Sequence, residues 1–319
     1  PSMMRRWITR LTVLLAAALV LTAVAIAALG SKALVSPVRR PIQDYHRAIL
    51  GKQAEYGLEV HDLGRPANIP CHLYLPSKSP GTARKSRALR AELDRRGVAM
   101  PSWGTTIGTI VLLHGHKGRK EDHLPIAERF CAAGFACVAC DLPGHGEHPG
   151  PVATFGAGEV AMIDELLSAI RSIRPLPGPT ALFGISQGGA IALQAADSDT
   201  APYYAVASLA SFARLDMVVE HSARNYHPIT RTLSGPSTGL VRLGTRIRAG
   251  FDPAEIRPVE AAGALAIPVF IGHGGRDRFI PSTHADLIHQ AVPHPHKTLR
   301  LVPDGRHGNV LAVGGNMLY

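Results

Sequence analysis

Aromatic residues, cysteines and acidic residues are all scarce in this chain. Phe, Trp and Tyr make up 5% of its 319 residues, and no recognition motif or interleaved aromatic residue accompanies the basic segments. Binding to nucleic acid is therefore not expected. Asp and Glu number 24 against 34 Lys and Arg, which gives a formal net charge of +10. The composition is otherwise typical of a packed protein, and the length suffices for one large α/β domain with an insertion.

The four cysteines do not form a redox or metal motif. Cys137 and Cys140 have the spacing of a redox C-x-x-C pair, but they lie in the apolar run 135–140, which has the pattern of a buried strand. Side chains three positions apart on a strand point to opposite faces, so these two thiols are not expected to pair. We expect both to be small buried residues, and the sequence leaves the disulfide status of all four cysteines, Cys71 and Cys131 included, open.

Residues 11–29 form an uninterrupted run of apolar residues and threonine, preceded by Arg5, Arg6 and Arg10. A helix over this run would be roughly 28 Å long, close to the thickness of a bilayer core. The apolar part of a cleaved signal peptide is shorter, about 7–15 residues. We therefore expect residues 1–30 to be an uncleaved membrane anchor, with a signal peptide and a buried helix as the alternatives.

The orientation of this segment is not decided by its charges, because basic residues flank the apolar run on both sides. N-terminal segments of this kind most often export the chain that follows. We expect a single-pass membrane protein with an extracytoplasmic main domain. Cleavage of the segment would instead make the protein secreted.

A second basic segment covers residues 77–102. Glu92 and Asp94 are outnumbered there by Lys78, Arg84, Lys85, Arg87, Arg90, Arg95 and Arg96. We expect a solvated helical insertion. A surface that rests on anionic lipid headgroups beside the anchor is the alternative.

From residue 55 onward, short buried strands alternate with helices, which predicts a mostly parallel, doubly wound sheet with right-handed crossovers. A leading antiparallel pair is expected at 56–61 and 69–75, and later strands at 109–113, 135–140, 180–185, 204–209, 267–271 and 298–302. The alternation breaks over 212–258, which we interpret as a lid inserted between strands. The expected organisation is an anchor or signal (1–30), a linker (31–54) and one domain (55–319).

Two segments match the G-x-S-x-G pattern of a nucleophile elbow. In residues 184–188, Ser186 follows an apolar strand and precedes an alanine-rich helix, so a tight turn would hold its hydroxyl near the positive end of that helix. In residues 235–239, no apolar strand precedes Ser237, and Pro236 lies within what we interpret as a polar loop. Ser186 is therefore the candidate nucleophile, and Ser237 is interpreted as a coincidental match.

Distinctive residues also follow the other expected strands, at the edge where sites form in open parallel sheets. His114-Gly-His116 follows the strand at 109–113. DLPGHG (141–146), HGGRDRFIP (273–281) and PDGRHGN (303–309) follow the strands at 135–140, 267–271 and 298–302.

In this order, the motifs resemble those of the α/β-hydrolase superfamily over residues 55–315, especially its lid-bearing serine esterases and lipases of the monoacylglycerol lipase kind. The resemblance implies an α/β-hydrolase fold in which Ser186 is the nucleophile, His307 the general base and Asp277 the acid that orients the imidazole. It also implies an oxyanion hole made by the backbone N–H groups of His116 and Gln187. Gln187 departs from the family pattern, in which Met is common.

The remaining histidines and acids receive other interpretations. His145 and His273 resemble family turn residues that hold loops by hydrogen bonds. Asp304 is too close to His307 in sequence to come from a different strand end. His114, His116 and His123 lie in one segment without a nearby constellation of carboxylates, so no metal site is expected.

These residues predict a serine hydrolase that cleaves a carboxylic ester of a small or lipidic acyl substrate through an acyl-enzyme, without a cofactor or metal. Peptidase, thioesterase or acyltransferase activity on the same triad is the alternative. A further alternative is a hydrolase-like binding protein without catalytic activity. The lid and the basic insertion match no signature that would identify the substrate.

Overall fold

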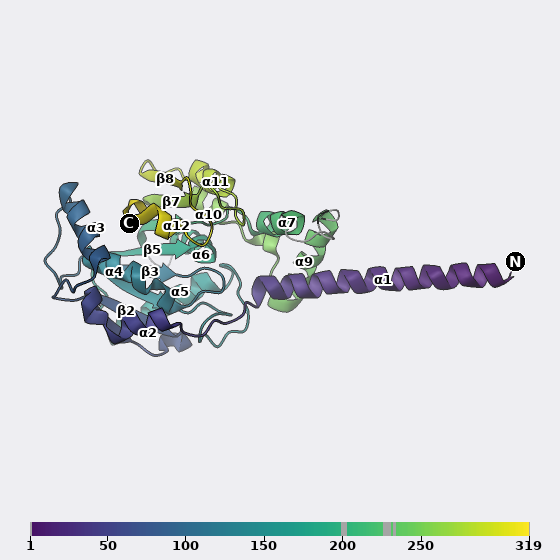
Figure 1. Cartoon of the computed structure of the whole chain (residues 1–319), viewed down its shortest axis with the longest axis horizontal. Helices are drawn as coiled ribbons and strands as arrows, with labels where there is room; N and C mark the ends of the chain where they lie inside the picture. Colours follow the sequence, from purple (N-terminus) through teal and green to yellow (C-terminus); the bar gives the residue numbers. More distant parts are fainter. Residues whose placement is uncertain (1, 199–202, 226–230, 232–233, 319) are drawn as a thin grey trace.

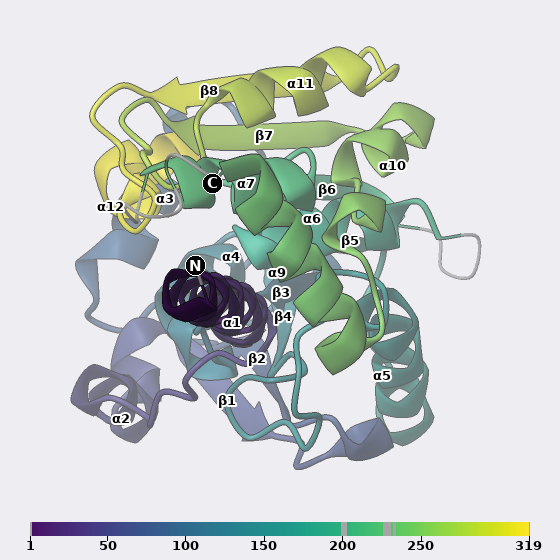
Figure 2. The same ribbon diagram turned by 90° about the vertical axis from the view of Figure 1, so that its right-hand side faces the viewer.

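The computed structural model describes residues 2–198, 203–225, 231 and 234–318, and its central feature is an eight-stranded sheet between layers of helices (Figures 1 and 2). The strand order is β1-β2-β4-β3-β5-β6-β7-β8. The strands are β1 (Leu58–Asp62), β2 (Cys71–Pro76), β3 (Gly108–Leu113), β4 (Phe135–Cys140), β5 (Thr180–Ile185), β6 (Tyr203–Leu209), β7 (Val269–Gly274) and β8 (Lys297–Val302).

The sheet is antiparallel only at its β1 edge. β2 pairs antiparallel with both β1 and β4, whereas every later pair of neighbours is parallel. β3 is buried along its whole length, as its continuous apolar sequence predicts for a strand covered on both faces. The predicted α/β class, with a mostly parallel doubly wound sheet, is confirmed.

Helices cover both faces of the sheet and create two separate cores. One core contains buried side chains of α5 (Glu159–Ile173), α6 (Gln187–Ala196), α10 (Pro258–Ala264) and α11 (Thr283–Ala291). The other contains side chains of α2 (Asp44–Gly51), α4 (Leu124–Ala132) and α12 (Val310–Gly314). Cys137 and Cys140 lie in different cores, as expected for strand positions three apart, and all four cysteines are buried free thiols.

The N-terminal segment is a long helix, α1 (Ser2–Val35), whose first part projects away from the rest of the molecule (Figure 1). Met3–Val35 is long and apolar enough to cross a membrane. α1 continues five residues past the expected end at residue 30. The expected linker at 31–54 therefore contains the end of α1, helix α2 and a 3-10 turn at Gln53–Tyr56.

The lid region at 212–258 contains the helices α7 (Leu215–Asn225) and α9 (Ser234–Ala249). The interpretation of residues 235–239 as a polar loop is wrong, because Ser237 lies in the first turn of α9. Pro236 is compatible with this position, since the first turn of a helix needs no backbone N–H donor. α9 packs along the C-terminal part of α1 (Figure 2).

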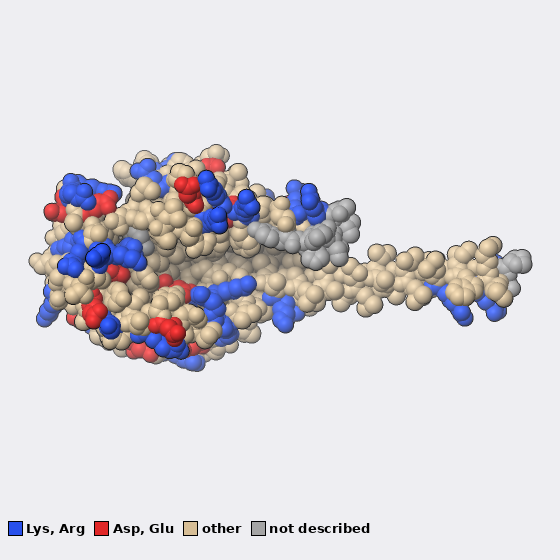
Figure 3. All heavy atoms as spheres, in the orientation of Figure 1, with Lys and Arg blue, Asp and Glu red and all other residues tan. Residues whose placement is uncertain are grey.

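The basic segment at 77–102 contains the expected helix, α3 (Arg84–Arg95), most of whose side chains are exposed. Its buried Leu89 is part of the face that packs on α4. Acidic side chains are interspersed with the basic ones at this end of the molecule (Figure 3). α3 lies at the opposite end of the molecule from α1, so it does not form a basic surface beside that helix (Figure 1).

All four thiols are expected to be unreactive towards a small disulfide reagent such as Ellman's reagent in the folded chain. Each cysteine side chain is at most 1% exposed, and burial raises the pKa of Cys71 to about 12. In denaturant without reductant, all four should react. A fast-reacting thiol in the folded state, or fewer than four in denaturant, would contradict the buried, reduced arrangement.

Candidate active site

Ser186 occupies the turn between β5 and α6 in a strained backbone conformation, with φ 55° and ψ −116°. The turn is possible because two glycines leave room for crossing backbones. A Cβ on Gly184 would lie 2.0 Å from the carbonyl oxygen of Gly188, and a Cβ on Gly188 would lie 2.0 Å from that of Leu113. The serine hydroxyl is therefore presented at the sheet edge, beside the first turn of α6.

The loops after β7 and β8 bring Asp277 and His307 to this serine. Nε2 of His307 lies 3.0 Å from Oγ of Ser186, and Nδ1 of His307 lies 2.7 Å from Oδ2 of Asp277. Oδ1 of Asp277 accepts hydrogen bonds of 2.9 Å from the backbone N–H groups of Phe279 and Ile280. Three side chains that the sequence places after three different strands thus form one hydrogen-bonded chain.

The electrostatics around Asp277 favour its charged form. Burial works to raise the pKa of this carboxyl, but hydrogen bonds from His273 and His307 outweigh it and hold the pKa well below its usual range. Asp277 is therefore ionised at neutral pH and faces the imidazole as a fixed negative charge. His273 also contacts the carbonyl oxygen of Ile280 at 2.9 Å, and His145 contacts that of Pro143 at 2.8 Å, as expected of histidines that hold loops.

The loop after β3 passes directly beside the nucleophile. A Cβ on Gly115 would lie 3.3 Å from the Cβ of Ser186. Within the described residues, the backbone N–H groups of His116 and Gln187 donate to no backbone carbonyl, so they are available to a bound substrate. Their role as an oxyanion hole stays a prediction.

The side chains of His116 and Gln187 contact each other next to Ser186. Nδ1 of His116 lies 3.3 Å from Oε1 of Gln187. The pKa of His116 is lowered by burial, against the opposing effect of hydrogen bonding to Gln187 and to the backbone of Ala33 in α1. Nε2 of Gln187 is buried and has no partner in the described part of the chain.

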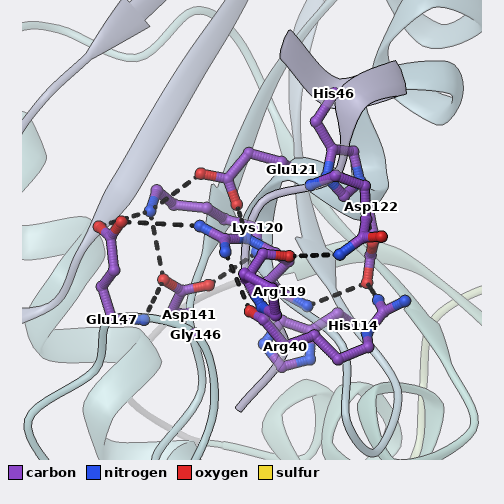
Figure 4. Close-up of polar contacts among 12 residues, drawn as sticks. Arg40, His46, His114, Arg119, Lys120, Glu121, Asp122, Asp141, Gly146 and Glu147 are labelled. Carbon is purple, nitrogen blue, oxygen red and sulfur yellow. Dashed lines mark hydrogen bonds and ion pairs between the residues drawn. The ribbon is translucent and has the colours of Figure 1, made fainter.

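A cluster of charged side chains, buried except for the exposed Glu147, contacts the loop after β3 on the side away from Ser186 (Figure 4). Nζ of Lys120 lies 3.2 Å from Glu121, 3.2 Å from Asp141 and 3.0 Å from Glu147. Arg119 pairs with Glu121 at 2.5 Å. Asp141 also accepts hydrogen bonds of 2.8 Å from the backbone N–H groups of Lys120 and Glu147. The carboxylate of Asp141 thereby connects the loop after β3 to the turn after β4.

Arg40, between α1 and α2, joins this cluster (Figure 4). Its Nε donates to the carbonyl oxygen of Lys117 at 2.7 Å, and its guanidinium pairs with Asp122. Nη1 of Arg119 donates in turn to the carbonyl oxygen of Arg40 at 3.1 Å. The chain segment that follows α1 is therefore bonded to the loop beside the nucleophile. Sequence reasoning missed this cluster, because the charged run at 117–122 resembles solvated surface.

A cleft of about 750 Å³ opens at Ser186 between α1 and the lid helices. Its lining is mostly apolar. The polar residues among the described lining residues are Thr22, His116, Lys117, Ser186, Gln187, Ser222 and Ser237. Ser237 lines the cleft from α9, and its buried hydroxyl has no partner among the described residues, whereas Ser186 has His307. The contribution of α1 to the cleft was not foreseen from the sequence.

Among the described residues, no group of three or more His, Cys, Asp and Glu side chains is arranged to hold a metal ion. His114 is engaged within the loops, where its Nε2 accepts a hydrogen bond of 3.1 Å from the backbone N–H of Leu142.

Replacing Glu121 with Gln is expected to lower the unfolding free energy at neutral pH by about 2 kcal/mol. Burial works to raise the pKa of Glu121, but Arg119 and Lys120 outweigh it and lower the pKa to about 2. The charged form thus stabilises the fold above the unfolded pKa near 4.5, and this contribution is lost as the pH falls towards 2.

The measurement is urea unfolding of the full chain in detergent as a function of pH. The difference between wild type and Glu121→Gln should shrink below about pH 4. Glu59→Gln, an exposed position on β1, serves as the control and should remain near wild type. A difference in unfolding free energy between wild type and Glu121→Gln that increases below pH 4 would contradict this explanation.

Comparisons with known proteins give a family match over part of the chain and one relative of low identity. Residues 104–238 match the family described as serine aminopeptidase, S33. The uncharacterized protein YqkD of Bacillus subtilis (strain 168) is 24% identical over 205 residues, which cover 63% of this chain. The match spans 65% of YqkD, slightly less than two thirds of its length.

Solved structures share the architecture at low sequence identity. The Pyrococcus furiosus esterase Pf2001 superposes with a TM-score of 0.60 and 15% identity over 88% of this chain and 92% of its own. A membrane phospholipase A, described as a bacterial virulence factor, superposes with a TM-score of 0.50 and 16% identity over 97% of this chain and 93% of its own. Together with the sheet order, these likenesses show that the chain has the α/β-hydrolase fold.

Proposed function

We propose that this α/β-hydrolase is a serine hydrolase that cleaves carboxylic esters through an acyl-enzyme. The observation that carries the proposal is the hydrogen-bonded chain from Ser186 through His307 to Asp277. A serine hydroxyl is a weak nucleophile until a neighbouring base takes its proton. Here the base faces the hydroxyl with one ring nitrogen, and the ionised Asp277 holds the other.

In the proposed reaction, Oγ of Ser186 attacks the ester carbonyl carbon while Nε2 of His307 accepts the hydroxyl proton. Collapse of the tetrahedral intermediate breaks the bond to the alcohol oxygen, which takes this proton and leaves. A water molecule then gives a proton to His307 and attacks the acyl carbon. The carboxylic acid departs, and Ser186 regains its proton.

The developing oxyanion needs hydrogen-bond donors that are in place before the reaction. The backbone N–H groups of His116 and Gln187 are the proposed donors. Support comes from the close approach of the loop at Gly115 to Ser186 and from the lack of a backbone acceptor for either N–H group in the described residues.

The cleft favours an ester with a hydrophobic acyl group over a peptide. A carboxylate near the nucleophile would favour binding of a charged peptide N-terminus, and no Asp or Glu is among the described residues that line the cleft. Peptidase activity is the alternative that the family description suggests, and thioesterase or acyltransferase chemistry could use the same three side chains. We further propose that α1 is an uncleaved anchor and that the hydrolase domain is extracytoplasmic.

A fluorophosphonate probe is expected to label the wild-type chain and Ser237→Ala equally, and to leave Ser186→Ala unlabelled. Both serines lie in a G-x-S-x-G pattern and both line the cleft, so Ser237→Ala is the matched control. Gel fluorescence after labelling, together with mass spectrometry of the adduct, identifies the modified residue. Labelling that persists in Ser186→Ala would overturn the assignment of the nucleophile.

Replacing Asp277 with Asn should lower kcat for a p-nitrophenyl ester by about 10³- to 10⁴-fold, because the amide neither fixes the imidazole tautomer nor stabilises its positive charge. Asp304→Asn is the control. Asp304 is an exposed acid close to His307 in sequence, and it pairs with Arg276 at 3.0 Å. The measurement is steady-state kinetics of both variants. A large loss of kcat in Asp304→Asn, with little loss in Asp277→Asn, would contradict the assignment.

A further inference from the structure

The C-terminal part of α1 presents one continuous face to the cleft. Its cleft-lining residues follow intervals of three and one, which place them on one side of a helix. They are Thr22, Ala25, Ile26, Leu29, Gly30, Ala33 and Leu34. Lid helix α7 faces the same space with Leu215, Val218 and Val219. The cleft is therefore bounded by the N-terminal helix as well as by the lid.

Close packing holds α1 in this position. A Cβ on Gly244 of α9 would lie 2.2 Å from the carbonyl oxygen of Ala27, and a Cβ on Gly30 would lie 2.4 Å from a methyl carbon of Val241. Nε of Arg248 also lies 3.3 Å from Oγ of Ser31. Small residues thus bring the two helices together at two points, so the wall formed by α1 is built into the fold.

The length of α1 places this wall at a membrane surface. About 20 helical residues cross a bilayer core, and α1 has 34. Arg10 and the exposed Trp7 near the outer end are residue types that lie at headgroup level. A span counted from Arg10 ends near Gly30, so the cleft-lining turns overlap the last part of the span. Leu243 and Ile247 of α9 add exposed apolar surface, at 50% and 79% exposure.

The polar groups in the cleft suit the head of an ester substrate. Ser186 and Gln187 both line the cleft, and Nε2 of Gln187 has no partner among the residues that the structure describes. His116, whose Nδ1 lies 3.3 Å from Oε1 of Gln187, lines the same cleft as Ala33 of α1. A hydrophobic chain that follows the α1 face therefore leads to the nucleophile and to a free hydrogen-bond donor.

We propose that α1 is one wall of the acyl-binding site, and that the substrate is an acyl ester resident in the bilayer. One acyl chain lies along the α1 face from Thr22 to Ala33, and its carbonyl carbon lies at Ser186. The ester enters the cleft from the membrane rather than from bulk water. This inference rests on the function proposed above, because it names the substrate class of the same site.

The test compares two tryptophan substitutions three residues apart on α1. Ala25 lines the cleft, whereas Ala28 is exposed and is not among the lining residues. The full chain in mixed micelles is assayed with p-nitrophenyl butyrate and with p-nitrophenyl palmitate. Ala25→Trp should lower kcat/KM for the palmitate ester by about tenfold or more, because the indole occupies space needed by the distal chain. Ala25→Trp should lose less activity on the butyrate ester than on the palmitate ester, and both activities of Ala28→Trp should stay near wild type.

A second measurement tests directly whether the bound acyl chain contacts α1. A long-chain alkyl fluorophosphonate with a diazirine along its chain is attached to Ser186 and then irradiated. Cross-links should appear within residues 22–34 of α1. Cross-links only to other elements, or an Ala25→Trp variant that matches Ala28→Trp on the palmitate ester, would overturn the inference. A wild-type chain that hydrolyses neither ester and resists the fluorophosphonate would instead contradict the proposed function.

Discussion

At the start of α6 the backbone passes so close to β3 and to the end of β5 that only glycine fits at positions 184 and 188. This close crossing of the backbones fixes Ser186 at the tip of the turn in a strained conformation. The direction of its hydroxyl then decides where a base must lie. His307 lies in the loop after β8 and contacts the hydroxyl of Ser186, because the loops that follow parallel strands lie at the same edge of the sheet.

Two kinds of polar support surround this turn. On one side, the buried carboxylate of Asp277 receives two backbone N–H groups and faces two histidines, so its charge is satisfied without water. On the other side, the cluster around Lys120 and Asp141 connects the loop at Gly115 to the turn after β4. Both supports bury charge, which is costly unless every partner is present. The loops around the nucleophile are thus held by electrostatics in addition to the apolar packing of Leu142 and Ile280.

The central strands could be predicted because they are short apolar runs bounded by Gly, Pro or polar residues. The candidate site could be predicted because its residues come after strands. The helix at Ser234–Ala249 was missed, since Gly235, Pro236 and Gly239 are loop-forming residues that packing against α1 overrides. The cluster around Lys120 was missed for a related reason. Whether a charged residue is buried depends on partners far along the chain, such as Asp141, and local sequence does not reveal them.

The contact between α1 and α9 has a mechanical consequence. Because Gly30 and Gly244 bring the two helices into backbone contact, α9 cannot swing as a flap independent of α1. Any change in the tilt of α1 relative to the sheet carries α9 with it and alters the width of the cleft towards α7. In a bilayer, helix tilt adjusts to hydrocarbon thickness. For an anchored form of this chain, the shape of the lid would therefore be a property of the membrane as much as of the protein.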